Sequence, residues 1–154
     1  MNTQEYLKNV SDIIPEVKRL ASLYYKRLGR PLGVTGEIAE YEVIKKFGYN
    51  PAEPRATGHD SYRVINKKNQ LIEIKGRVLQ PDSSPGGRLG RIKKNSDCVA
   101  VILVLFNENY EATNFYEAPY LEIENFLSSA TGKAETERRQ LHLSKFISLA
   151  KEIS

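Results

Sequence analysis

The sequence has few of the residues that build disulfides and transition-metal sites. It contains one cysteine, Cys98, and two histidines, His59 and His142. A single cysteine excludes an internal disulfide and fits a reducing cytoplasm, which is the expected location. Because the two histidines lie far apart in the chain, the sequence does not predict a zinc site of the Cys/His type.

Long apolar runs are also absent. The longest, residues 98–106, is far too short to span a bilayer, and the polar residues after Met1 do not resemble a signal peptide. We therefore expect a soluble protein with no membrane partner. The net charge of +4 shifts the expectation modestly toward anionic partners, nucleic acid among them.

Hydrophobic periodicity predicts helices at both ends of the chain and strands between them. Apolar residues at three- and four-residue spacing predict helices over residues 3–28, 36–47, 120–129 and 144–153. Pro15 fits the first turn of a helix, so the first segment can also be interpreted as two helices. Strands are predicted over residues 51–55, 62–66, 71–75, 98–106 and 112–117.

These elements predict an α/β protein with a mixed central sheet flanked by helices. The 154 residues suffice for one domain with a hydrophobic core. Within it we expect an N-terminal helical segment over residues 1–30, a core over 35–118 and C-terminal helices over 119–154. The unbroken apolar run 98–106 is typical of a strand buried on both faces.

Charged residues of the predicted hairpin raise the question of a functional site. Glu73 and Lys75 share one face of strand 71–75, because alternate residues of a strand point the same way. Asp60 stands just before the preceding strand, 62–66. Because the two strands form a hairpin, Asp60 comes close to the end of strand 71–75 that carries Glu73 and Lys75. For an isolated Glu-x-Lys pair, a solvent-facing charge pair is the more ordinary interpretation.

The helix over residues 36–47 carries a further carboxylate. Glu40 shares the apolar face of that helix with Val43 and Ile44, and Glu37 lies on its flank. A carboxylate turned inward needs a partner, such as a metal ion or a lysine, unless it stays hydrated at the edge of the core. Asp60, Glu73 and Glu40 would then form a carboxylate cluster, and hard oxygen ligands suit Mg²⁺ or Mn²⁺.

Three motifs together resemble the PD-(D/E)XK nuclease superfamily, which has the restriction-endonuclease-like fold. They are "GEIAE" on a helix, "GHD" before a strand and "EIK" within the next strand, and the resemblance covers residues 35–106. It implies an αβββαβ core with extra N-terminal and C-terminal helices. Asp60 and Glu73 would bind the metal, Lys75 would be the catalytic lysine, and Glu40 would reach the metal directly or through water.

The activity implied by this resemblance is that of a Mg²⁺- or Mn²⁺-dependent endonuclease. It would hydrolyse phosphodiester bonds of nucleic acid, with DNA the expected substrate, and the analogy also suggests a homodimer. The sequence departs from the family in having His59 before Asp60. The alternative is a catalytically inactive module of the same fold that binds nucleic acid or a protein partner.

A basic, Gly- and Pro-rich segment over residues 79–97 stands where the resemblance implies a helix between the third and fourth strands. It lacks the Gly-Lys-Ser/Thr ending of a P-loop, so nucleotide binding is not predicted. We interpret it as a loop whose side chains contact phosphates, although a solvated loop fits equally well. The candidate nucleic-acid-binding residues are Arg77, Arg88, Arg91 and Lys93.

Overall fold

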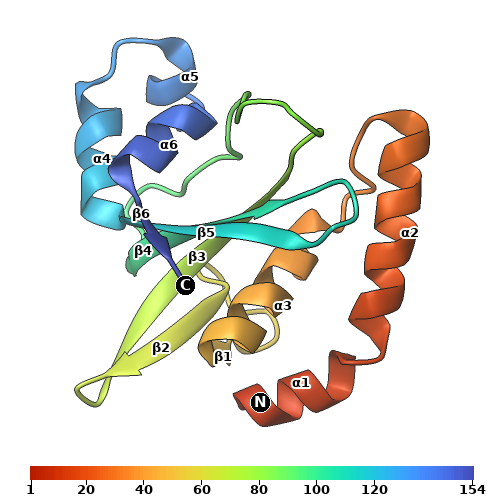
Figure 1. The fold of residues 1–154 in the computed structure, drawn as a ribbon. Coiled ribbons are helices and arrows are strands. Elements are labelled where there is room, and N and C mark those ends of the chain that lie inside the picture. The colour runs from red at the N-terminus through yellow and green to blue at the C-terminus, as the bar shows by residue number, and fades with distance from the viewer.

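The computed structural model describes residues 1–154 and is an α/β structure with a six-stranded mixed sheet flanked by helices (Figure 1). The strands follow one another across the sheet in chain order from β1 to β6. Strands β3 and β4 are parallel, and all other neighbours are antiparallel. The elements are α1 (Thr3–Val10), α2 (Ile13–Leu28), α3 (Thr35–Phe47), β1 (Asn50–Pro51), β2 (Ser61–Ile65), β3 (Lys68–Val78), β4 (Cys98–Phe106), β5 (Ala112–Pro119), α4 (Tyr120–Ser129), α5 (Lys133–Thr136), α6 (Leu143–Leu149) and β6 (Lys151–Ile153).

The N-terminal segment consists of two helices, α1 and α2, with Pro15 in the first turn of α2. The interpretation of this segment as two helices is therefore confirmed. Gly29 and Gly48 end α2 and α3 in the left-handed conformation, with φ of 68° and 69°. No helix of the structure combines the length and apolar character that crossing a membrane requires.

The predicted hairpin is confirmed as β2 and β3, which pair in register from Ser61 opposite Ile72. Asn66 and Lys67 form its turn with φ of 51° and 62°, the pair of positive values typical of two-residue hairpin loops. Strand β3 is longer than the predicted 71–75, whereas the predicted strand 51–55 is reduced to β1.

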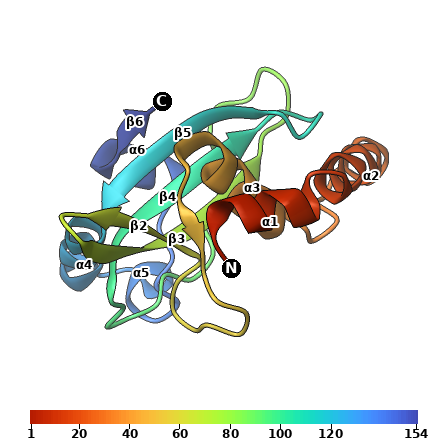
Figure 2. The ribbon, with the colours of Figure 1, turned by 90° about the horizontal axis from the view of Figure 1, so that it is seen from below.

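Strand β4 is buried on both faces, as predicted. Ala100, Ile102 and Val104 pack with α2, α3 and β3, while Val101 and Leu103 pack with the C-terminal helices. Figure 2 shows the sheet between these two helical groups, with α1, α2 and α3 on one side and α4 and α5 on the other. Glu73, Lys75 and Arg77 share the second face, because β3 pairs with β4 in parallel register.

The expected αβββαβ order is wrong in one respect, because no helix connects β3 with β4. Two prolines and three glycines within residues 79–97 disfavour a continuous helix there. The segment is nevertheless anchored, since Leu89 and Ile92 are buried in the core. Their backbone N–H groups donate to the carbonyls of Leu141 and Arg139, each at 3.0 Å.

The predicted last helix over residues 144–153 is also wrong in part. Helix α6 ends at Leu149, and the following residues form β6, which pairs antiparallel with β5. The exposed backbone groups of an edge strand attract another strand, and this tertiary pairing prevails over the helical pattern. The C-terminal region 119–154 therefore contains a strand in addition to helices.

A glycine of β3 allows α3 to lie close to the sheet. A Cβ at Gly76 would stand 2.9 Å from both the Ala39 Cβ and the Thr35 carbonyl oxygen. We expect Gly76→Ala to lower the free energy of unfolding by about 1–3 kcal/mol, because backbone and helix would have to shift. Urea unfolding measures the change.

Gly36→Ala is the matched control, since nothing lies within 4 Å of a Cβ placed there and its φ is not positive. Alanine favours a helix over glycine, so this variant should unfold at an equal or higher urea concentration. Equal stability of the Gly76→Ala variant and the wild type would contradict the close packing of α3 on β3.

Candidate functional site

Asp60 lies at the point where the β2–β3 ladder ends. Its backbone N–H donates to the Ile72 carbonyl at 3.0 Å, and its side-chain Oδ2 accepts a 2.7 Å hydrogen bond from the Ile74 N–H. The carboxylate thus takes the place of a backbone acceptor and is held beside β3. The hairpin therefore brings Asp60 next to the strand that carries Glu73, as the sequence predicted.

Glu73 and Lys75 form an ion pair on the same face of β3. The Lys75 Nζ lies 2.9 Å from Glu73 Oε1 and donates a 3.0 Å hydrogen bond to the Arg91 carbonyl. The Lys75 side chain is only 22% exposed, and the Glu73 side chain only 13%. Glu73 Oε2 is buried and has no hydrogen-bond partner, which is unfavourable for a carboxylate oxygen.

A pocket of about 250 Å³ collects these groups at one end of the hairpin. Asp60, Glu73 and Lys75 line it, and Lys93 reaches it from the loop between β3 and β4. The pocket thus combines carboxylates with lysine ammonium groups, a mixture that can hold a cation and an anion side by side. Its full lining is Gly58, His59, Asp60, Glu73, Ile74, Lys75 and Lys93.

Glu40 lines a neighbouring pocket of about 430 Å³ together with Asp60 and Tyr6. Burial raises the pKa of Glu40 to about 7, and the charges of Asp60 and Glu37 add to the effect. Burial also raises the pKa of Tyr6 to about 12, with a further contribution from Glu40. Tyr6 is a site residue that the sequence did not indicate, because it comes from α1, far from the motifs.

The three carboxylates expected to bind Mg²⁺ or Mn²⁺, Asp60, Glu73 and Glu40, do not line a single pocket. Asp60 shares one pocket with Glu73 and the other with Glu40, and no group of three or more Asp, Glu, His or Cys side chains could hold a metal ion as placed. The chemistry of the donors nevertheless fits a hard cation. Positive charge would satisfy the buried Glu73 Oε2 and lower the raised pKa of Glu40.

The four predicted nucleic-acid-binding residues differ in their surroundings. Arg77 donates to the Arg88 carbonyl at 3.2 Å, and Arg88 pairs with Glu135 at 2.8 Å. Arg91 and Lys93 are exposed, and their side chains make no hydrogen bond or ion pair. Arg77 and Arg88 therefore serve to position the loop, whereas Arg91 and Lys93 are available to a ligand.

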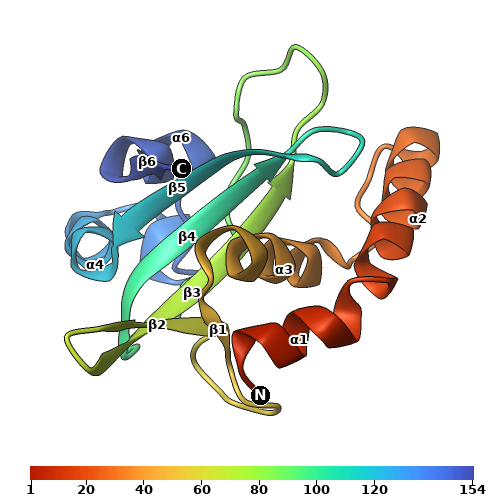
Figure 3. The same cartoon turned by 60° about the horizontal axis from the view of Figure 1, so that its bottom comes forward.

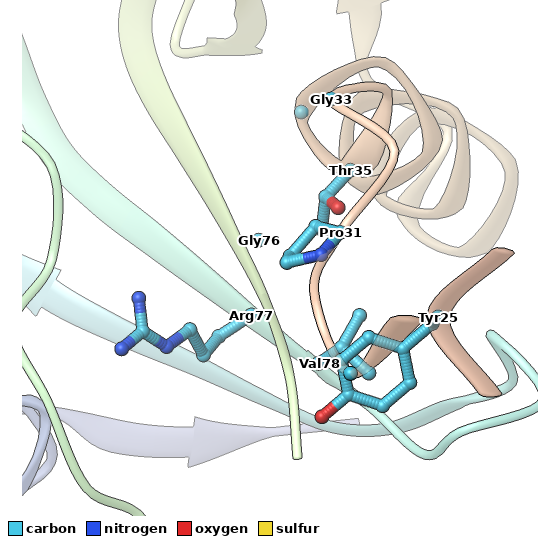
Figure 4. Close-up of a pocket in the computed structure, with 9 residues that line it drawn as sticks. Tyr25, Pro31, Gly33, Thr35, Gly76, Arg77 and Val78 are labelled. Atoms are coloured by element: carbon cyan, nitrogen blue, oxygen red, sulfur yellow. The ribbon is translucent and has the colours of Figure 1, made fainter. Parts of the chain in front are cut away.

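A larger pocket of about 520 Å³ lies between α2, the start of α3 and the end of β3 (Figure 4). Its residues include Tyr25, Thr35 and Gly76, but no carboxylate, histidine or cysteine. In Figure 4 the Arg77 side chain points away from Tyr25 and Val78, across strand β3. This pocket offers no acid–base pair, so the smaller pockets carry the candidate chemistry.

Cys98 is a buried residue at the start of β4. Its thiol donates a 3.1 Å hydrogen bond to the Gly58 carbonyl and so ties the "GHD" segment to the sheet. Burial raises the pKa of the thiol, which disfavours the thiolate required of a nucleophile.

The chain matches no family model and no curated protein.

The raised pKa of Glu40 makes stability depend on pH. Its value in the folded protein, about 7, exceeds the ordinary 4.5, so folding stability falls as pH rises from about 4.5 through 7. We expect Glu40→Gln to remove this decline and to stabilise the protein at pH 8 by roughly 1 kcal/mol, a value discounted for partial solvent exposure. Thermal melts between pH 4.5 and 8 measure it.

Glu111→Gln is the control, because Glu111 is exposed on the turn between β4 and β5. Its melting profile should follow that of the wild type over the whole pH range. A decline in Glu40→Gln as steep as that of the wild type would mean that Glu40 is not the titrating group.

Proposed function

We propose that the protein is a metal-dependent nuclease that hydrolyses phosphodiester bonds of nucleic acid, with DNA as the substrate. The observation that carries the proposal is the pocket in which Asp60, Glu73 and Lys75 meet, with one oxygen of Glu73 buried and unpaired. These residue types, an Asp before one strand and Glu-x-Lys on the next, suit metal-assisted phosphoryl hydrolysis.

Membership of the PD-(D/E)XK superfamily is part of the proposal. Helix α3, the antiparallel strands β1, β2 and β3, and the parallel strand β4 follow one another as in a restriction-endonuclease-like core. The second helix of that core is replaced by the loop over residues 79–97. The order of the strands supports the resemblance, while the missing helix limits it to the part of the core that holds the candidate site.

Asp60 and Glu73 would hold Mg²⁺ or Mn²⁺, with Glu40 as a further ligand, directly or through water. When bound, such a cation supplies positive charge to a phosphate and lowers the pKa of water. Glu73 positions the Lys75 ammonium by their 2.9 Å ion pair. Lys75 then orients the attacking water or stabilises negative charge on the phosphate.

Two exposed basic side chains at the pocket could contact the phosphates of a nucleic acid. Lys93 lines the pocket itself. Arg91 is held near the pocket because its backbone carbonyl accepts a hydrogen bond from Lys75. Contacts from such side chains to phosphates position a duplex without reading its sequence.

Cleavage assays test the proposed activity. The purified protein should cut single-stranded, duplex or branched DNA in the presence of Mg²⁺ or Mn²⁺. Lys75→Ala and Asp60→Asn should each slow cleavage by about 100-fold or more, because each removes a charge needed in the transition state. Lys68→Ala, at the exposed far end of β3, is the matched control and should cleave at the wild-type rate. Equal rates for the wild type and both site variants would refute the mechanism.

A non-catalytic binding module of the same fold is the second candidate. It is favoured by the Glu73–Lys75 ion pair and by the absence of a three-ligand metal group. Such a module would bind DNA in a salt-sensitive way and leave it intact with either metal.

DNA binding itself should depend on the exposed loop side chains. We expect Arg91→Ala/Lys93→Ala to weaken binding to all sequences alike and to reduce the slope of log K against log salt concentration by about 2. Fluorescence anisotropy of a labelled duplex at several salt concentrations measures both effects. Lys68→Ala/Lys133→Ala, which removes two exposed lysines elsewhere, should leave the slope unchanged. An unchanged slope in the Arg91→Ala/Lys93→Ala variant would exclude this loop as the binding surface.

A further inference from the structure

Helix α2 stands at the edge of the molecule, with one face against the body and the other turned outward (Figure 3). The inner face is buried through Ile14, Ala21, Ser22 and Tyr25. The outer face, on the opposite side of the helix, carries three large apolar side chains that are exposed to solvent. Ile13, Leu20 and Leu23 are 52%, 45% and 37% exposed.

The outer face has the spacing of a seam between two helices. Ile13, Leu20 and Arg27 recur every seven residues, and Glu16 and Leu23 each follow three residues after one of them. This is the a/d pattern of a heptad repeat, in which the a and d side chains of one helix pack against those of a second helix. We call these five residues, Ile13, Glu16, Leu20, Leu23 and Arg27, the α2 strip.

The charges of the α2 strip make it complementary to itself. In a parallel pair of α2 helices, Glu16 would face Glu16 and Arg27 would face Arg27, which is repulsive. In an antiparallel pair, one register places Leu20 opposite Leu23 of the second copy and also Glu16 opposite Arg27. Both contacts are centred on the same point of the helix, so a single two-fold axis forms each of them twice.

We propose that the protein forms a homodimer through antiparallel packing of the α2 strip against a second copy of itself. Leu20 and Leu23 form the apolar centre, Glu16 and Arg27 form flanking ion pairs, and Ile13 lies beside the C-terminal end of the partner helix. Glu16 gives up its ion pair with Arg19 on the same helix, which is exposed and therefore worth little. The proposal does not depend on nuclease activity.

Oligomeric state tests the apolar centre. Analytical ultracentrifugation over a range of concentrations should show the wild type as a monomer–dimer equilibrium. Leu20→Asp/Leu23→Asp should raise the dissociation constant by about 100-fold or more, because it places like charges at the centre of the interface. Leu121→Asp is the control: Leu121 is 67% exposed on α4, and this variant should dimerise like the wild type. Circular dichroism checks that all variants remain folded.

Charge exchange tests the antiparallel register without altering the apolar residues. Glu16→Arg and Arg27→Glu should each raise the dissociation constant by about 5-fold, and the double exchange should restore it, because the pair is re-formed with reversed sign. A wild type that stays monomeric at the highest concentrations would overturn the proposal. So would a dimer that the leucine substitutions leave intact, or a double exchange that weakens association further instead of restoring it.

Discussion

The parallel pairing of β3 with β4 is the constraint on which the rest of the structure depends. Parallel neighbours require the chain to travel back from the end of one strand to the start of the next, a crossing that a helix usually makes. Here an irregular segment over residues 79–97 makes it, so its backbone polar groups need partners outside the segment. Lys75 and Arg77 of β3 donate to the carbonyls of Arg91 and Arg88, and Arg139 donates to that of Ile92 at 2.8 Å.

This arrangement joins the candidate site to the loop. Lys75 bonds to Glu73 on one side and to the Arg91 carbonyl on the other, so one ammonium group serves both the carboxylate and the loop backbone. A phosphate in the pocket would compete with both acceptors for that ammonium. The position of the exposed Arg91 and Lys93 side chains is thus coupled to the ionic contacts of Lys75, so the loop over residues 79–97 is part of the candidate site.

Local patterns in the sequence predicted the parts of the fold that local physics decides. The break before Pro15, the β2–β3 hairpin and the doubly buried strand β4 each follow from a proline, a turn or an unbroken apolar run. Ion pairs between residues far apart in the chain could not be predicted from such local patterns. Arg139 stands in a charged run yet is 7% exposed and paired with Glu124. Glu42 of α3 is likewise only 14% exposed and is paired with Lys18 of α2. Strand β6 likewise depends on the free edge of β5.

In the candidate site, too, some features follow from local sequence patterns and others only from tertiary contacts. Helical periodicity placed Glu40 on the inner face of α3, and the hairpin placed Asp60 beside Glu73. The spacing did not predict that Glu40 and Glu73 line separate pockets, each of which they share with Asp60. The surroundings of these carboxylates come from the tertiary structure: Asp60 accepts a hydrogen bond from the Ile74 N–H, while burial near Asp60 and Glu37 disfavours the charge of Glu40. Glu40 thus carries less than a full negative charge near pH 7. A cation that reached Asp60 would therefore gain additional negative charge from Glu40, because it would favour loss of the Glu40 proton.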